Sequence, residues 1–171
     1  MKAKMNRRQR GFSLVEVMVS VLVLSGGLLG LAFLQAQGMK FNAEAYQRTQ
    51  ATVLAYDMID RLRANPAAAN AGAYVVADNA AAQYAATTTP QACDTSDGSV
   101  SCNEDELAAF DLFRWYQAQQ KSLALDTSNY ATIQRAVINS TLDRHTITMF
   151  WVEQGNPKTQ QWEVRLYVPP T

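Results

Sequence analysis

The sequence has few of the residues from which metal and catalytic sites are usually built. Its 171 residues include one histidine, His145, and two cysteines, Cys93 and Cys102. This number is too small for the cysteine and histidine ligand sets of structural zinc sites. The sequence also contains no nucleophile-elbow, P-loop, zinc-peptidase or dinucleotide-binding motif. We therefore expect a protein that is not an enzyme and that holds neither a metal ion nor a cofactor.

Charged residues are also scarce, at 18% of the chain, compared with about 25% in typical soluble domains. Five of the 15 basic residues fall within the first ten positions, where there is no acidic residue. Residues 11–171 therefore hold 10 basic and 15 acidic residues, for a net charge of −5. An acidic body argues against nucleic-acid binding, which needs a surface that neutralises phosphates. The length allows one globular domain with an appendage.

A long apolar run follows the basic residues. Residues 12–34 carry a single charge, Glu16. As a helix this run would be about 34 Å long, enough to cross a bilayer core of about 30 Å. The positive-inside rule keeps the basic segment in the cytoplasm and places the chain beyond residue 34 in the periplasm or outside the cell.

Two ordinary explanations of the apolar run are weaker. A cleavable secretory signal has an apolar region of about 7 to 15 residues that ends in an A-x-A-like site. This run is longer, and its nearest candidate site, Leu34-Gln35-Ala36, is poor at its first position. A simple permanent anchor explains the length but leaves Glu16 unexplained, because an ionisable group inside a membrane helix is costly and requires a partner.

The start of the apolar run carries a recognisable pattern. A basic leader ends in Arg10-Gly11 and is followed by Phe12-Ser13-Leu14-Val15-Glu16. This pattern resembles the class III leader of type IV prepilins and pseudopilins. The resemblance implies that a prepilin peptidase cuts after Gly11 and methylates the new amino group of Phe12. It also implies that Glu16 pairs with the amino terminus of a neighbouring subunit, where buried opposite charges would compensate each other.

Helical periodicity continues past the apolar run, so we expect one helix over 12–64, about 80 Å long. Its half 12–34 would lie in the membrane, and its half 35–64 is amphipathic. Asn65 before Pro66 is expected to end it. Pilins usually carry a proline near the end of the apolar segment, where their helix melts in the filament. This chain has no proline there, although the glycine-softened segment around Gly26 could serve instead. Because the usual proline is missing, the comparison with pilins favours a minor pilin over a bulk filament subunit.

The amphipathic half predicts two sets of solvated ion pairs at i,i+4 spacing. One set would run along Lys40, Glu44 and Arg48, and the other would join Asp57 to Arg61. Each such pair contributes only a few tenths of a kcal/mol, about 0.3. They are therefore expected as features of an exposed helix face.

Residues 65–171 are expected to form a periplasmic α+β head. The alanine-rich segment 65–89 is interpreted as a partly helical connector on the surface. Cys93 and Cys102 should form a disulfide in an oxidising compartment, with a free redox pair as the alternative. A calcium loop in this region is disfavoured, because the first and third positions of the frame lack carboxylates.

A helix should begin at Asn103, which can form a capping box with Glu106, and continue to about Leu123. It would pack against both the long helix and the sheet, because it has apolar residues on more than one face. Its segment from Asp111 to Trp115 resembles a feature of the PilV group of minor pilins, although a tryptophan that fills the core is the simpler explanation.

The last forty residues alternate in period two, which predicts an antiparallel meander. The first expected strand covers 133–139. One face of the next strand would hold Ile147, Met149 and Trp151, and a turn at Gly155-Asn156-Pro157 would lead to the last strand. This last strand would present Trp162, Val164, Leu166 and Val168 on one face and end at Pro169-Pro170. His145 is expected at the surface or at a strand edge.

These observations predict an α+β, type IV pilin-like fold: a long transmembrane and amphipathic helix packed on a small antiparallel sheet. The resemblance implies a minor pilin, anchored by one span in the bacterial inner membrane and later in the pilus at or near its tip. Its partners would be the prepilin peptidase, the other minor pilins and the major pilin, with no small-molecule substrate. The role would be priming of pilus assembly, in support of twitching motility and cell adhesion. Alternatives are the I-type minor pseudopilin of type II secretion and, less favoured by the acidic charge, a DNA-uptake receptor pilin.

Overall fold

The computed structural model describes residues 11–94, 101–123 and 130–168. The basic part of the predicted leader and the predicted stop at Pro169-Pro170 lie outside the described residues. The elements follow in the order α1 (Leu14–Ala64), α2 (Pro66–Ala71), α3 (Asn79–Thr87), α4 (Glu104–Ser122), β1 (Thr132–Asn139), β2 (Leu142–Glu153) and β3 (Asn156–Tyr167). The chain forms two compact units, Met1–Ala43 and Glu44–Thr171, and we call the second the globular unit.

The long helix α1 is continuous over 51 residues and ends at Ala64, as the periodicity predicts. Its end has a local cause, because the ring of Pro66 disfavours helical backbone at the residue before it. Asn65 accordingly leaves the helical region, with φ −127° and ψ 65°. The chain then turns into the short helix α2.

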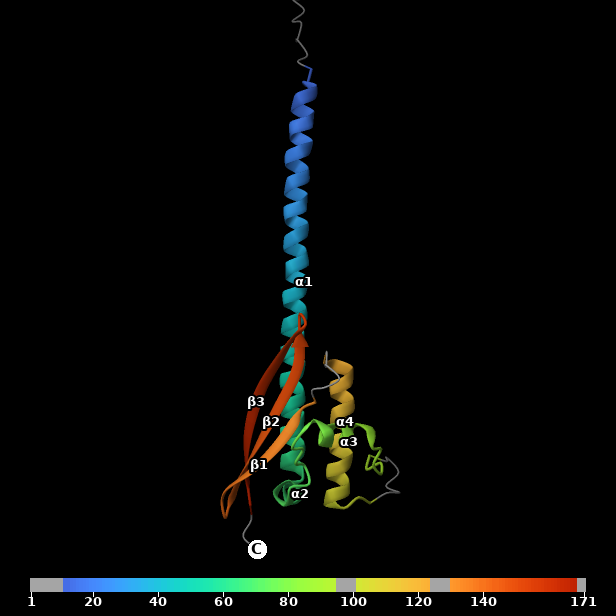
Figure 1. The fold of residues 1–171 in the computed structure, drawn as a ribbon, viewed down its shortest axis with the longest axis vertical. Coiled ribbons are helices and arrows are strands. Elements are labelled where there is room, and N and C mark those ends of the chain that lie inside the picture. Colours follow the sequence, from blue (N-terminus) through green and yellow to red (C-terminus); the bar gives the residue numbers. More distant parts are fainter. Residues whose placement is uncertain (1–10, 95–100, 124–129, 169–171) are drawn as a thin grey trace, which may run out of the picture. The chain divides into compact units, whose positions relative to one another are not determined.

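The core of the globular unit is built on one face of α1. The buried residues of this face are Ala51, Leu54, Ala55, Met58, Ile59 and Leu62. The fully buried Trp115 of α4 donates a 2.8 Å hydrogen bond from its indole N–H to the carbonyl of Leu54. Its neighbour Tyr116, also buried, donates from its hydroxyl to the carbonyl of Ala131, just before β1, at 2.6 Å. These two hydrogen bonds join α4 to α1 and to the residue that precedes β1; Figure 1 shows α4 beside the lower part of α1.

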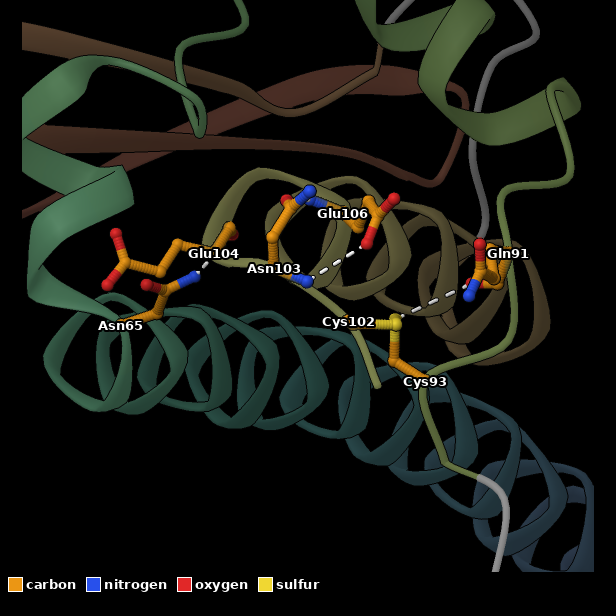
Figure 2. Close-up of a disulfide and its surroundings, with 7 residues drawn as sticks. All are labelled: Asn65, Gln91, Cys93, Cys102, Asn103, Glu104 and Glu106. Carbon is orange, nitrogen blue, oxygen red and sulfur yellow. Dashed lines mark hydrogen bonds between the residues drawn. A yellow bond between two sulfur atoms is a disulfide. The ribbon is translucent and has the colours of Figure 1, made fainter. Parts of the chain in front are cut away.

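The start of α4 confirms the predicted capping box and disulfide. The side-chain oxygen of Asn103 accepts from the backbone N–H of Glu106, and the Glu106 carboxylate accepts from the backbone N–H of Asn103, both at 2.9 Å. Cys102, the residue before this cap, is joined to Cys93 by a disulfide with the two Cα atoms 5.8 Å apart (Figure 2). The disulfide thus joins the segment that follows α3 to the residue that directly precedes the cap of α4.

The alanine-rich connector does more than cover the surface. It forms α2 and α3, and it contributes Ala68, Ala69, Tyr74, Val76, Ala82 and Ala86 to the core. Val76 also forms an isolated antiparallel bridge to Ile133 of β1. The small alanine side chains let these short helices pack closely against their neighbours, which period analysis alone does not reveal.

The sheet has the order β1-β2-β3, and both pairs are antiparallel, which confirms the predicted meander. Ile147, Met149 and Trp151 lie buried on one face of the central strand β2. On β3, Val164 and Leu166 are buried as predicted. Together with α1 and α4, this sheet gives the globular unit its α+β architecture.

The hairpin turn between β2 and β3 lies one residue earlier than predicted. Glu153 pairs with Asn156, so the turn consists of Gln154 and Gly155, with φ values of 50° and 79°. Two consecutive positive φ values suit the twist of a two-residue hairpin, and Gly155 adopts one without strain. Pro157 lies in the edge strand β3, where its missing N–H is tolerated.

The prediction for His145 is wrong. The imidazole is fully buried on the central strand, and in the described part of the chain neither ring nitrogen has a hydrogen-bond partner. Its position follows from the strand period, because His145 is two residues before Ile147 and points to the same face. Burial is the largest cause that lowers the pKa of His145, with Asp143 acting in the opposite direction.

The predicted ion pairs along α1 are only partly formed. Asp57 and Arg61 form the expected i,i+4 pair at 3.0 Å. Arg48 instead donates two hydrogen bonds to the carboxylate of Glu153, from Nε at 2.8 Å and from Nη2 at 3.0 Å. The prediction failed here because a carboxylate at the end of β2 offers bidentate geometry that an exposed neighbour on the same helix does not.

The contact between Arg48 and Glu153 ties the β2–β3 hairpin to α1. The indole N–H of Trp151 donates to the same carboxylate at 2.8 Å. The hydrogen bonds from Arg48 are the main reason that the pKa of Glu153 is lowered to about 2; burial opposes this shift and the bond from Trp151 reinforces it. We call Arg48, Trp151 and Glu153 the hairpin clasp.

Candidate processing and assembly segment

The residues at the predicted cleavage point precede the first helical turn. Gly11, Phe12 and Ser13 have no regular secondary structure, and α1 begins at Leu14. The backbone carbonyl of Ser13 accepts the first helical hydrogen bonds, from the N–H of Glu16 at 3.0 Å and of Val17 at 3.3 Å. The Gly11–Phe12 peptide bond therefore lies in exposed, non-helical backbone, where a peptidase can reach it.

Glu16 lies in the first turn of α1 on the same side as Phe12. Both line a shallow groove that is completed by Val17, Ser20, Val21 and Leu24. A carboxylate in the first turn is favoured by the helix dipole. Within the described residues Glu16 forms no ion pair, so its carboxylate is available to a cation from outside this part of the chain.

The surface around this groove is apolar over more than four turns of helix. An 18-residue window of α1 has a mean hydropathy of 2.4 and none of it is buried, so this helix is long and apolar enough to cross a membrane. The hydroxyls of Ser20 and Ser25 donate to the carbonyls of Glu16 and Leu22, at 2.7 and 2.9 Å. Their polar groups are thus satisfied inside the helix, as a lipid environment requires.

The glycines of this segment are not in close contact with any other part of the described chain. A Cβ added at Gly26, Gly27 or Gly30 would meet no atom within 4 Å. The helix is nevertheless continuous through all three. In the single chain the helix is therefore not interrupted at these glycines, and softening of this segment inside a filament stays a prediction.

Comparison with known protein families supplies independent information about this segment. A family model described as the prokaryotic N-terminal methylation motif matches residues 6–32. A second model, described as type IV pilin Tt1218, matches residues 33–113. Both matches support the type IV pilin/prepilin family. No match was found among curated proteins or among solved structures.

The two matches meet at residues 32 and 33, near the end of the most apolar part of α1. The methylation motif includes Gly11, Phe12 and Glu16, so it supports a pilin that is processed by prepilin peptidase. The same motif on an apolar helix fits an anchor in the inner membrane. The second match runs from residue 33 through α2 and α3 into α4, and thus includes the disulfide. The type IV pilin family is a structural, non-enzymatic one.

A polar network at the carboxyl end of α1 was missed by sequence reasoning. Arg61 donates to Asp111 of α4 at 2.6 Å, and the hydroxyl of Tyr74 donates to the other oxygen of the same carboxylate at 2.7 Å. Figure 2 shows a second link, in which the Asn65 side chain donates to the carbonyl of Glu104 at 2.7 Å. Asp111 is buried, and its carboxylate accepts hydrogen bonds from both Arg61 and Tyr74.

The segment from Asp111 to Trp115 is therefore explained by the fold. Asp111 and Trp115 are four residues apart on α4, and both contact α1, through Arg61 and the carbonyl of Leu54. No separate binding role is needed to account for either side chain. Among the described residues, no group of three or more histidine, cysteine or acidic side chains is placed to hold a metal ion.

Proposed function

We propose that this pilin is a minor pilin of the PilV kind, which is processed after Gly11, methylated on Phe12 and used to prime the assembly of a type IV pilus. The observation that carries the proposal is the joint placement of the exposed Gly11–Phe12 bond and the Glu16 carboxylate at the start of an exposed apolar helix. Support for a minor role is the absence of any proline before Pro66, with α1 continuous over its whole length.

The proposed mechanism follows from charge and burial. Cleavage after Gly11 creates an ammonium group on Phe12. Inside a bundle of apolar helices, an unpaired carboxylate or ammonium is costly, so Glu16 of one subunit and the new amino terminus of a neighbour favour one register. In this proposal the leader 1–11 is removed, and the segment 12–34 enters the membrane and later the filament. The segment 35–64 supports the periplasmic head, and the head, 65–171, selects neighbouring subunits near the pilus tip.

The first test measures processing by intact mass in cells with and without prepilin peptidase. We expect loss of the first eleven residues and gain of one methyl group only when the peptidase is present. Gly11→Val should block cleavage. Gly30→Val is the matched control, because this glycine also faces open space, and it should be cut normally. An uncut chain in both strains would replace the proposal with an ordinary membrane anchor.

The second test separates processing from assembly. Glu16→Gln should be cut and methylated like the wild type, yet it should be depleted from sheared pili and should not restore piliation to a deletion strain. Glu44→Gln, an acidic residue later in the same helix, is the control and should restore piliation. If deletion abolishes protein secretion and leaves piliation intact, the I-type pseudopilin is the correct assignment.

A further inference from the structure

The globular unit has a groove that the proposed function does not use. It lies between α3 and α4, has a volume of about 390 Å³ and is lined mostly by apolar side chains. α3 buries Ala82 and Ala86 toward the core, so that Ala81, Tyr84 and Ala85 are left on the side of the groove. From α4 it receives Asp105, Ala109 and Leu112, which follow each other at helical spacing.

The shape of the groove suits a bulky apolar side chain. Ala81, Ala85 and Ala109 are small, and they leave space between the larger Tyr84 and Leu112. Tyr84 is 70% exposed, although it is a large aromatic residue next to this apolar surface. An inserted side chain would remove both the alanine floor and the tyrosine ring from water, which is the main source of affinity at protein interfaces.

The negative charge in the groove favours an occupant that is positively charged. Among the described residues that line it, Asp105 alone is charged, and its carboxylate makes no hydrogen bond or ion pair with any of the described residues. The neighbouring Glu104 is also exposed, whereas the Glu106 carboxylate is engaged in the capping box. A partner with a positive charge therefore gains an ion pair here, and a partner with a negative charge is repelled.

We infer that this groove binds a peptide segment of a partner protein in which a bulky apolar residue stands beside a lysine or arginine. The apolar residue fills the space above Ala85 and Ala109, and the basic residue pairs with Asp105. The inference does not rest on the proposed pilus function, because none of these residues takes part in processing or in the pairing of Glu16.

The test uses the full chain in detergent micelles and two synthetic peptides with the same leucine and tryptophan residues. One peptide carries lysines and the other carries glutamates at the remaining positions. Fluorescence anisotropy should show binding of the lysine peptide, weakened by salt, and little binding of the glutamate peptide. Asp105→Lys should weaken binding by about tenfold or more, an amount expected for loss of one well-placed charge pair with reversal of its sign.

Two matched controls separate the groove from general surface charge. Glu104→Lys makes the same charge change in the same helical turn but outside the groove, and it should change the affinity by less than about threefold. Ala109→Trp should block the groove, whereas Gln120→Trp, at another exposed position of α4, should not. Circular dichroism of each variant checks that α4 is folded.

Three results would overturn the inference. The glutamate peptide could bind as tightly as the lysine peptide, or Asp105→Lys and Glu104→Lys could have equal effects. In the third, sedimentation shows self-association that Ala109→Trp abolishes, and the occupant is then a second copy of this chain. None of these results affects the mass of the processed chain, so the proposed function stands or falls separately.

Discussion

Replacing Glu153 with glutamine should loosen the hairpin clasp and remove part of the acid sensitivity of the globular unit. The carboxylate receives two hydrogen bonds from Arg48 and one from Trp151. Its side chain is 4% exposed, whereas that of Arg48 is 60% exposed. Solvent therefore screens the charge of the arginine, and the buried indole N–H depends more strongly on its acceptor.

The expected loss in free energy of unfolding depends on which hydrogen bonds remain after each substitution. Glu153→Gln keeps an acceptor for Trp151 and loses the charge, so the free energy of unfolding should fall by about 1 kcal/mol, the usual difference between hydrogen bonds to charged and neutral groups. Glu153→Ala leaves the indole N–H of Trp151 without that acceptor. It should cost about 1 to 3 kcal/mol more, the penalty for an unsatisfied buried donor.

The free energy of unfolding should also depend on pH in a way that identifies Glu153. The pKa of Glu153 is lowered from 4.5 to about 2, so its contribution to stability is complete above about pH 4.5 and is lost as the pH falls toward 2. Urea unfolding of the full chain in micelles, followed by tryptophan fluorescence, should show this loss in the wild type and a weaker loss in Glu153→Gln. Glu163→Gln is the control, because that carboxylate is 54% exposed and lies 3.9 Å from its ion-pair partner. Equal free energies and parallel pH profiles for wild type and Glu153→Gln would refute the role of the clasp.

Three further predictions concern stability. The double change Cys93→Ser, Cys102→Ser should lower the free energy of unfolding by about 2 to 3 kcal/mol, the value for closure of a short loop; a reductant should then affect the melting temperature of the wild type only. Trp115→Phe removes the donor to the Leu54 carbonyl and should cost about 1 to 2 kcal/mol in urea unfolding, and an unchanged midpoint would contradict that bond. Burial lowers the pKa of His145 below its ordinary 6.5, so the wild type should lose stability as the pH falls below 6.5. His145→Leu should reduce that slope without loss at neutral pH, because the imidazole has no hydrogen-bond partner within the described residues; identical slopes would show that the imidazole does not titrate there.

Local signals were enough for the elements that short-range chemistry controls. The end of α1 depends on Pro66, the start of α4 on Asn103 and Glu106, and the disulfide on two cysteines nine residues apart. Each of these features is encoded within a few residues of the chain. For that reason they can be predicted from the sequence without knowledge of the packing.

The contacts of Glu153 and Asp111 could not be predicted in the same way. The partners Arg48 and Glu153 are 105 residues apart, and Arg61 and Asp111 are 50 residues apart. The turn at Gln154 and Gly155 begins one residue earlier than expected, yet Ile147, Met149 and Val164 face the core as predicted, because the alternation along each strand sets its faces independently of the turn.

The sequence by itself determined the apolar segment 12–34 with its single acidic residue, the basic stretch before it and the α+β class of the rest. These depend on composition, period and spacing, which are local properties. Only the tertiary structure decided which carboxylates are buried, which arginine each one meets, and that the alanines of α3 and α4 leave a groove with Asp105 at its side. The physical reason is that burial and pairing arise when distant segments meet, and the free energy of a charged group depends on that environment more than on its neighbours in the chain.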